Sequence, residues 1–254
     1  SPWGDGRPGW HSECVVMSLE LLGEGFDLHC GGADLRFPHH ENERAQAVAL
    51  GKQFANHWMH NGFVVDPEGE KMSKSIGNVA NLLDLLDNYD PRAYRMLLLQ
   101  THYRSPVKVG QDNIDASVQA LAGLDSFAAR SAGRTAAADA DTLARFVQIM
   151  DNDLDTPNAM AHIFDTVRRA NTAIDAGEAA AGALTAAVHE MCGALGLPLG
   201  STGEVADDAQ ALAVALDAAR GAKDFAKADA LRAELQSLGY VVETTKAGTA
   251  LRRS

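Results

Sequence analysis

A chain of 254 residues is long enough for one large domain or for two to three modest ones, each with its own core. With 46% hydrophobic and 22% charged residues and no run of 18 apolar residues, the composition is that of a soluble globular protein and excludes a transmembrane helix. The formal net charge of -12 argues against a non-specific nucleic-acid coat, so a nucleic-acid partner would have to be met by local basic patches.

The N-terminal residues and the cysteines indicate in which cellular compartment the protein is expected. Residues 1–9 lack a charged segment followed by an apolar one, so we expect no signal peptide. A turn-rich start without Met indicates that the chain begins inside a larger domain. Three scattered cysteines favour a reducing compartment, by default the cytoplasm, over a disulfide framework. Of these, Cys30 is expected to be a small buried hydrophobe.

The first 50 residues alternate helix and strand. Residues 14–22 predict a helix that ends near Gly23, and residues 26–30 predict a short strand stopped by Gly31 and Gly32. A second helix is predicted from about residue 39 to residue 50. This alternation favours an α/β layer.

A zinc-type donor set lies within this stretch. His39 and Glu43 are four residues apart at the start of a helix, so both side chains point to one side. Together with Cys14 they offer a thiolate, an imidazole and a carboxylate, which suits zinc, a metal that accepts all three. From spacing alone the imidazole could come from His39 or His40, because His40 also shares a face with Glu43.

Residues 70–78 form a short segment that carries two lysines and two serines and is entered through Pro67, Glu68 and Gly69. Ammonium groups and hydroxyls can grip a polyphosphate. A glycine-flanked loop can also close over a nucleotide and stabilise the charge that grows on a departing pyrophosphate.

Helices dominate the rest of the chain. A short amphipathic helix is predicted over 81–89, and Asp90 and Pro91 cap and open another over 92–102. Between residues 111 and 195 the alanine-rich pattern predicts about four helices in a bundle, one of them opened by Thr156 as cap and Pro157. The region before the bundle is locally basic, with Arg92, Arg95, Arg104 and Lys108.

The C-terminal segment follows a probable linker over 197–204 that contains Pro198 and two glycines. Two helices are predicted over 207–220 and 224–238. A β-hairpin is expected to follow, with strands at 239–243 and 249–251.

Several motifs in register resemble cysteinyl-tRNA synthetase, a class I aminoacyl-tRNA synthetase. They occupy residues 9–14, 27–35, 37–43 and 58–62, and residues 71–75 read letter for letter as the signature loop of that class, Lys-Met-Ser-Lys-Ser. The resemblance runs through the whole chain, more loosely after about Ser105. It implies the carboxy-terminal portion of such an enzyme, because the family's other nucleotide motif, a His-rich tetrad of the N-terminal half, is absent.

The resemblance implies an α/β fold, part of a Rossmann-like catalytic domain, followed by a helical bundle and a small α+β module. The catalytic part with its zinc site and signature loop would occupy residues 1–75. A stem-contact helical region would follow over 76–110, the bundle over 111–200 and an anticodon-binding module over 205–254.

The resemblance also assigns site residues. Cys14, His39 and Glu43 would be zinc ligands, with another cysteine upstream of Ser1 as the fourth, and the metal would bind the thiolate of the substrate. The amino-acid pocket would be lined by Trp10, by His29 near the substrate carboxylate and by Asp34 near its ammonium group. Lys71 and Lys74 would be catalytic, and ATP would be bound by Lys71, Met72, Ser73, Lys74 and Ser75.

In the C-terminal module, Arg220 and Asp229 would contact anticodon bases. The hairpin departs from the family at residues 243–245 and at Leu251, where a tryptophan is usual. Part of the base contact is therefore expected to be altered or lost.

The implied activity is ATP-dependent activation of L-cysteine to cysteinyl-adenylate, with Mg²⁺ on the ATP, and transfer of the cysteinyl group to tRNA-Cys. The intact enzyme is expected to be a monomer without a membrane partner, and this chain alone is expected to be inactive. Two alternatives stay open at this point. One is the cysteine:glucosaminyl-inositol ligase of mycothiol synthesis, which lacks a comparable anticodon module, and the other is a non-catalytic RNA-binding fragment.

Overall fold

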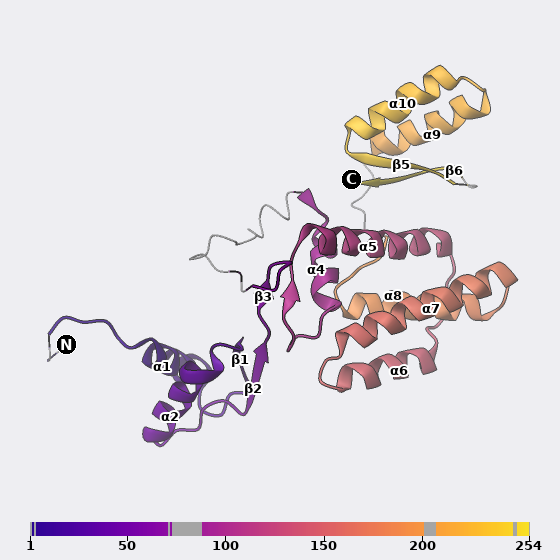
Figure 1. Cartoon of the computed structure of the whole chain (residues 1–254). Coiled ribbons are helices and arrows are strands. Elements are labelled where there is room, and N and C mark those ends of the chain that lie inside the picture. The colour runs from indigo at the N-terminus through magenta and orange to yellow at the C-terminus, as the bar shows by residue number, and fades with distance from the viewer. Residues whose placement is uncertain are drawn as a thin grey trace. The chain divides into compact units, whose positions relative to one another are not determined.

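The computed structural model describes residues 2, 4–70, 72, 88–200, 207–245 and 248–253. The chain divides into two compact units, Ser1–Leu197 and Pro198–Ser254 (Figure 1). Their boundary lies inside the segment predicted as a linker. Residues 81–87 of the helix predicted over 81–89 and the lysines of the signature loop lie outside the described residues.

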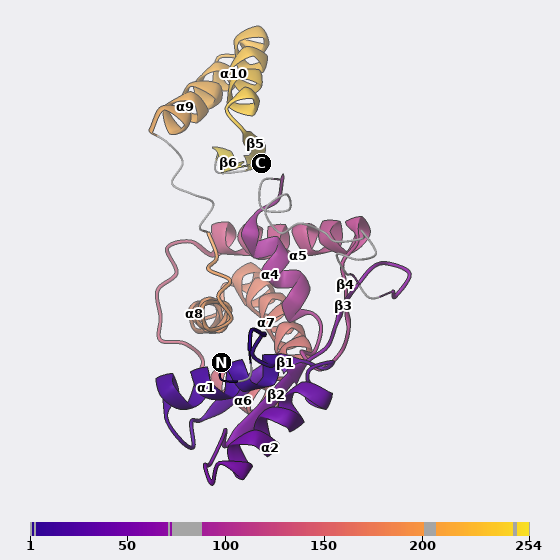
Figure 2. The same cartoon turned by 90° about the vertical axis from the view of Figure 1, so that its left-hand side faces the viewer.

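The first unit begins with a small α/β layer. It contains the helices α1 (Trp10–Leu22) and α2 (Glu41–Ala49), one turn of π-helix, η1 (Arg36–His40), and the strands β1 (Leu28–Gly32) and β2 (His57–Asn61). The two strands pair in parallel, with Leu28 opposite His57 and Gly32 opposite Asn61. Figure 2 shows α1 and α2 beside these strands. A small apolar core made of Val15, Phe26, Ala47 and Phe54 holds the layer together.

One prediction for this layer needs correction. The strand does not stop at the two glycines but runs through them, because Gly31 and Gly32 pair with His60 and Asn61. A side chain on Gly31 would meet the His40 ring, since a Cβ there would lie 2.7 Å from the ring carbon Cε1. The glycines therefore allow a close approach of strand and histidine. The helix predicted from about residue 39 is preceded by η1, in which Phe37 has an extended backbone (φ -143°, ψ 134°), so the continuous helix begins close to the predicted start.

A second pair of parallel strands connects this layer to the helices. Strand β3 (Val64–Val65) pairs with β4 (Val107–Lys108), and helix α4 (Pro91–Leu99) lies between them in the chain. As predicted, Asp90 caps α4, because its side chain accepts a hydrogen bond from the backbone N–H of Arg92. Met72 packs against the apolar cluster of this region.

Four helices complete the first unit, as the alanine-rich pattern predicts: α5 (Gln111–Ser131), α6 (Ala140–Asp151), α7 (Thr156–Ala176) and α8 (Ala180–Ala194). They pack into a bundle around Leu124, Ile163 and Met191 (Figures 1 and 2). The cap of α7 is Asp155 and not Thr156, because the Asp155 carboxylate accepts from the N–H of Asn158. Carboxylates are strong N-caps, so the helix begins one residue earlier in the sequence than predicted.

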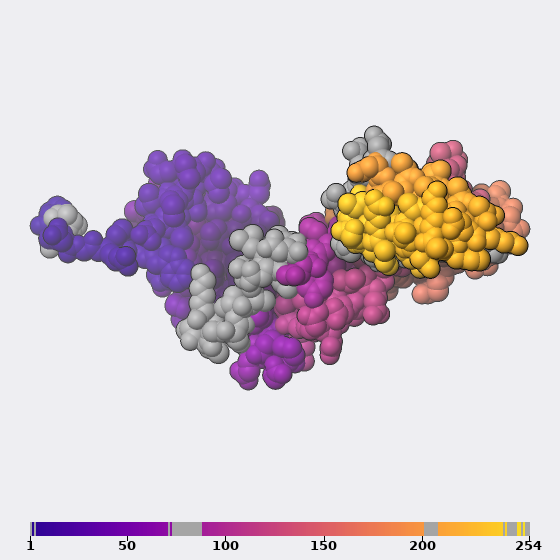
Figure 3. Space-filling view, turned by 90° about the horizontal axis from the view of Figure 1, so that it is seen from above, coloured from indigo at the N-terminus to yellow at the C-terminus, as the bar shows by residue number. Residues whose placement is uncertain are grey.

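The second unit consists of α9 (Asp207–Gly221), α10 (Phe225–Ser237) and the antiparallel strands β5 (Tyr240–Thr245) and β6 (Gly248–Arg253). This is the predicted helix pair and hairpin. Its core contains Leu216, Leu235 and Tyr240. Figure 3 shows the unit, in orange to yellow, as a continuous mass of packed side chains.

Candidate metal centre

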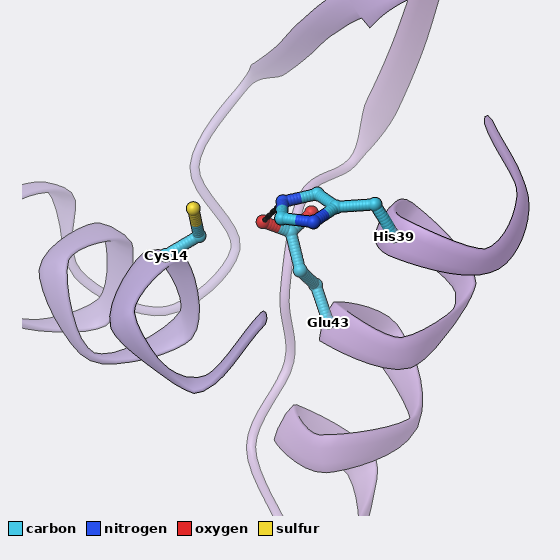
Figure 4. Close-up of side chains that lie close together, drawn as sticks. All are labelled: Cys14, His39 and Glu43. Atoms are coloured by element: carbon cyan, nitrogen blue, oxygen red, sulfur yellow. Dashed lines mark ion pairs between the residues drawn. The ribbon is translucent and has the colours of Figure 1, made fainter. Parts of the chain in front are cut away.

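Three side chains from separate segments converge inside the α/β layer. Cys14 projects from α1, His39 from the end of η1 and Glu43 from the first turn of α2 (Figure 4). One donor atom from each lies within 4.8 Å of the other two. The i, i+4 spacing of His39 and Glu43 brings them to one side, and packing of α1 on α2 brings Cys14 to them.

The carboxylate of Glu43 is the centre of this cluster and has no solvent exposure. Its Oε2 accepts a hydrogen bond of 2.9 Å from Nε2 of His29. Its Oε1 lies 3.1 Å from Nε2 of His39, yet among the described residues no group hydrogen-bonds to it. A buried acceptor without a partner costs about 1–3 kcal/mol, so this oxygen fits a position where a cation binds.

The other ring nitrogen of His39 is also engaged. Its Nδ1 lies 2.7 Å from Nδ1 of His11, so one of these two nitrogens donates and the other accepts. Metal-binding histidines usually hold their second nitrogen in such a hydrogen bond, which fixes the ring. The sequence prediction missed His11, although its position three residues before Cys14 places both on one face of α1.

Sulfur, nitrogen and oxygen donors at this spacing match the ligands of zinc. Burial, together with the neighbouring Glu43, raises the pKa of the Cys14 thiol above its ordinary value. Ligation by a cation would hold the sulfur as a thiolate despite this shift. The residues present therefore fit a zinc ion, with Cys14, His39 and Glu43 as its protein ligands.

A second donor set shares the same glutamate. His29, His40 and Glu43 also place one donor atom each within 4.8 Å of one another. Nδ1 of His40 is held at 2.8 Å from Nε2 of His60, and burial lowers the pKa of both rings. Both histidines left open by the sequence thus lie beside Glu43, but only the His39 set contains a sulfur.

The three residues predicted to line an amino-acid pocket differ in how close they lie to the metal cluster and in how exposed they are. Trp10 is 59% exposed, and its ring centroid lies 4.1 Å from that of His39, so it covers the cluster on the solvent side. His29 is in the cluster itself. Asp34 lies in the exposed turn after β1, and the donor sets found among the described residues do not include it. Cys30, expected to be buried, is exposed.

The predicted ATP-binding residues Lys71, Ser73, Lys74 and Ser75 lie outside the described residues. Met72 is described, and its backbone N–H donates to the carbonyl of Val64 at 3.0 Å.

In the second unit, Arg220 lies in the last turn of α9 and Asp229 is exposed on α10. One guanidinium nitrogen of Arg220, Nη1, is buried and has no hydrogen-bond partner among the described residues. Leu251, which departs from the family pattern, packs against the core of this unit. The side chains of 243–245 lie outside the described part of the chain.

Comparison with known proteins gives two matching family models. Residues 1–119 match the catalytic domain of class I (C) tRNA synthetases, and residues 145–200 match the DALR domain. A cysteine–tRNA ligase of Halorhodospira halophila is 45% identical and is aligned with 100% of this chain, which covers 57% of the relative. One from Kocuria rhizophila is also 45% identical, with 98% of this chain and 55% of the relative covered.

Among solved structures, a leucyl-tRNA synthetase of Agrobacterium radiobacter in a ternary complex with tRNA and LeuAMS shares the fold. The TM-score is 0.54 at 16% identity, over 67% of this chain and 28% of that chain.

Proposed function

We propose that the protein containing this chain has cysteine–tRNA ligase activity. The reason is that the chain is homologous over its whole length to cysteine–tRNA ligases, as its motifs predicted. That protein would join L-cysteine and ATP, with Mg²⁺ on the ATP, into cysteinyl-adenylate and would transfer the cysteinyl group to tRNA-Cys. The chain spans about 57% of the length of the relatives it matches, so the activity is proposed for the chain together with the remaining part.

The observation that carries the proposal is the buried oxygen of Glu43 that faces Cys14 and His39 without a hydrogen bond. When bound there, zinc would take up the substrate sulfur as a thiolate, a contact that the protonated hydroxyl of serine makes poorly. A fourth protein ligand, a cysteine from outside these 254 residues, belongs to the proposal.

Neighbouring residues hold the ligands in place. The hydrogen bond from His29 fixes Oε2 of Glu43 and leaves Oε1 directed at the metal position. His11 engages Nδ1 of His39, so that Nε2 of His39 faces the same position. Fixing the ligands before substrate arrives lowers the cost of binding in the productive geometry. Trp10 would limit the access of water from the exposed side.

The other contacts are proposed from the family resemblance. Lys71 and Lys74 would contact ATP together with the rest of the signature loop, and Asp34 would meet the substrate ammonium group. Arg220 and Asp229 would contact anticodon bases. A monomer in the cytoplasm is the expected state.

Two alternatives predicted from the sequence are less well supported. The cysteine:glucosaminyl-inositol ligase is not favoured, because cysteine–tRNA ligases match the chain over its entire length, including the helix pair and hairpin of the second unit. A non-catalytic RNA-binding fragment would have no need of the metal cluster. Metal binding by the protein that contains the chain, with the fourth ligand present, therefore separates this alternative from the synthetase.

The test is the cobalt spectrum of the purified chain and its zinc content. Thiolate ligation gives cobalt(II) an absorption band in the near ultraviolet, and we expect Cys14→Ser to remove it and to weaken zinc retention. Cys30→Ser is the matched control, because Cys30 is exposed and lies outside the donor sets. If Cys14→Ser kept the band, or if Cys30→Ser lost it, the assignment of the metal centre would be wrong.

A further inference from the structure

The connection between α6 and α7 holds an aspartate in an uncommon backbone conformation. Asp153 and Leu154 follow one another with φ values of 59° and 55°, in the left-handed region that residues other than glycine rarely adopt. Residues strained in this way persist where surrounding contacts hold them, often at functional sites. Here the backbone presents the Asp153 carboxylate to a segment around Tyr103, 50 residues earlier in the chain.

Three consecutive residues of that segment contact Asp153. The Tyr103 hydroxyl donates to Oδ1 at 2.7 Å, and Arg104 donates from Nε to Oδ2 at 2.6 Å and from Nη2 to Oδ1 at 2.9 Å. Nε2 of His102 lies 3.1 Å from the backbone carbonyl oxygen of Asp153. A single exposed ion pair holds little, but a bidentate pair with a third donor fixes both the position and the orientation of the segment.

The segment held by Asp153 is joined to the end of β2. The backbone N–H of Gly62 donates to the carbonyl of Tyr103 at 2.7 Å. The two backbones are so close that a Cβ on Gly62 would lie 2.2 Å from the carbonyl oxygen of Ser105. A shift of the segment would therefore move Gly62, which directly follows Asn61, the last residue of β2.

Strand β2 connects this position to the metal centre. His60 lies two residues before Gly62, and its Nε2 is 2.8 Å from Nδ1 of the buried His40. His40 in turn shares a donor set with Glu43. Arg104, His60 and His40 line one hollow of the first unit, so the segment held by Asp153 and the metal centre face the same space.

We propose that Asp153 is a positioning residue for the metal centre. It holds residues 102–104, which fix the end of β2, and through His60 and His40 it fixes the surroundings of Glu43. The donor sets found among the described residues do not include Asp153, so it acts through other residues. Groups that orient the neighbours of metal ligands tune the affinity for the metal. The inference rests on the proposed function, because it names a residue on which the selection of cysteine depends.

The experiment compares two substitutions in the intact protein that contains the chain. Asp153→Gly removes the carboxylate, and glycine adopts a φ of 59° without strain. Asp153→Asn removes only the charge, because asparagine also tolerates this conformation. Zinc affinity, measured against a competing chelator, should fall by roughly three- to tenfold in Asp153→Gly and by less in Asp153→Asn. The loss is smaller than the roughly 10–100-fold expected for a direct partner of a ligand.

The kinetics of cysteine activation give a second measurement, which a purely structural role would not change. In cysteine-dependent exchange between pyrophosphate and ATP, Asp153→Gly should raise the KM for cysteine by a similar factor. The KM for ATP should stay as in the parent, because ATP is proposed to contact the signature loop and not the metal.

Asp175→Asn is the matched control, because it breaks another exposed arginine–aspartate pair of the bundle, the one between Arg130 on α5 and Asp175 on α7. Zinc affinity and the KM for cysteine should stay as in the parent. If both quantities were unchanged in Asp153→Gly, the contacts of Asp153 would be purely structural and the proposal would be overturned. An equal loss in Asp175→Asn would overturn it as well, because a general loss of stability would then explain the effect.

The parent protein tells the two failures apart. A parent that bound no zinc would overturn the proposed metal centre and this inference together. A parent that binds zinc, with an Asp153→Gly variant that binds it equally well, would overturn this inference alone.

Discussion

Replacing Glu43 by glutamine should raise the stability of the metal-free chain and reduce the stability that the chain gains from zinc. Glutamine keeps the shape of the side chain but removes its charge. In the metal-free protein the amide oxygen can still accept from His29, while the amide nitrogen can donate to Nε2 of His39, 3.1 Å from the present Oε1. The substitution thus gives a hydrogen bond to a position that now has only the ion pair with His39 among the described residues.

The magnitudes follow from this geometry. Without metal, Glu43→Gln should raise the free energy of unfolding by up to about 1–3 kcal/mol, the cost of an unsatisfied buried group. With zinc at a hundred times the parent's Kd, the parent gains about 2.7 kcal/mol from binding. A variant whose Kd is 100-fold weaker gains only about 0.4 kcal/mol, and losing even an outer partner of a ligand weakens metal affinity by roughly 10–100-fold.

Urea unfolding followed by tryptophan fluorescence is the suitable assay. The three tryptophans are at positions 3, 10 and 58, and the rings of Trp10 and Trp58 lie 4.1 Å and 5.2 Å from those of His39 and His40. The signal therefore reports the α/β layer. Glu20→Gln, an exposed change on α1, is the control. The reasoning fails if zinc stabilises Glu43→Gln as much as it stabilises the parent.

Further predictions concern ion pairs and a close backbone contact in the first unit. Arg92→Ala should lower the free energy of unfolding by about 3 kcal/mol, because it leaves the buried carboxylate of Asp125 without its main partner. Urea unfolding followed by circular dichroism measures this change. The double variant Arg92→Ala/Asp125→Ala should recover part of the lost stability. Hydrogen bonds from Arg104 and Tyr103 hold the pKa of Asp153 well below its ordinary value, so its contribution to stability is present at neutral pH. Asp153→Asn should lower the urea midpoint at pH 7, and the difference should shrink as the pH falls below 3.8, the ordinary value; a difference independent of pH would contradict the assignment. Gly62→Ala should destabilise the chain by about 1–3 kcal/mol in the same assay, since a Cβ there would lie 2.2 Å from the backbone carbonyl oxygen of Ser105.

Local signals explain which elements could be predicted. Asp90 followed by Pro91 specifies a helix start through a side-chain cap and a fixed φ, and α4 begins there. Gly177 ends α7 in the left-handed conformation, as a glycine after a helical run indicates. The error at Gly31 has the opposite origin. Its role depends on a histidine nine residues later, and nothing in the local sequence distinguishes a glycine that stops a strand from one that makes room.

The same distinction applies to the site. The pairing of His39 with Glu43 follows from helix periodicity alone, whereas Cys14, 25 residues earlier, is brought in by the packing of α1 on α2. The hydrogen bond from His29 to Glu43 depends on the register of β1 and could not be derived from spacing. The contact of Asp153 with Arg104 is missed for a similar reason, because no pattern in the sequence links these two residues, which are 49 positions apart.

The two adjacent histidines allow one helix turn to serve two sites. Neighbouring residues in a helix point about 100° apart, so His39 turns to the Cys14 side of Glu43 while His40 turns to the His29 side. Gly31 makes this possible by leaving room for the His40 ring.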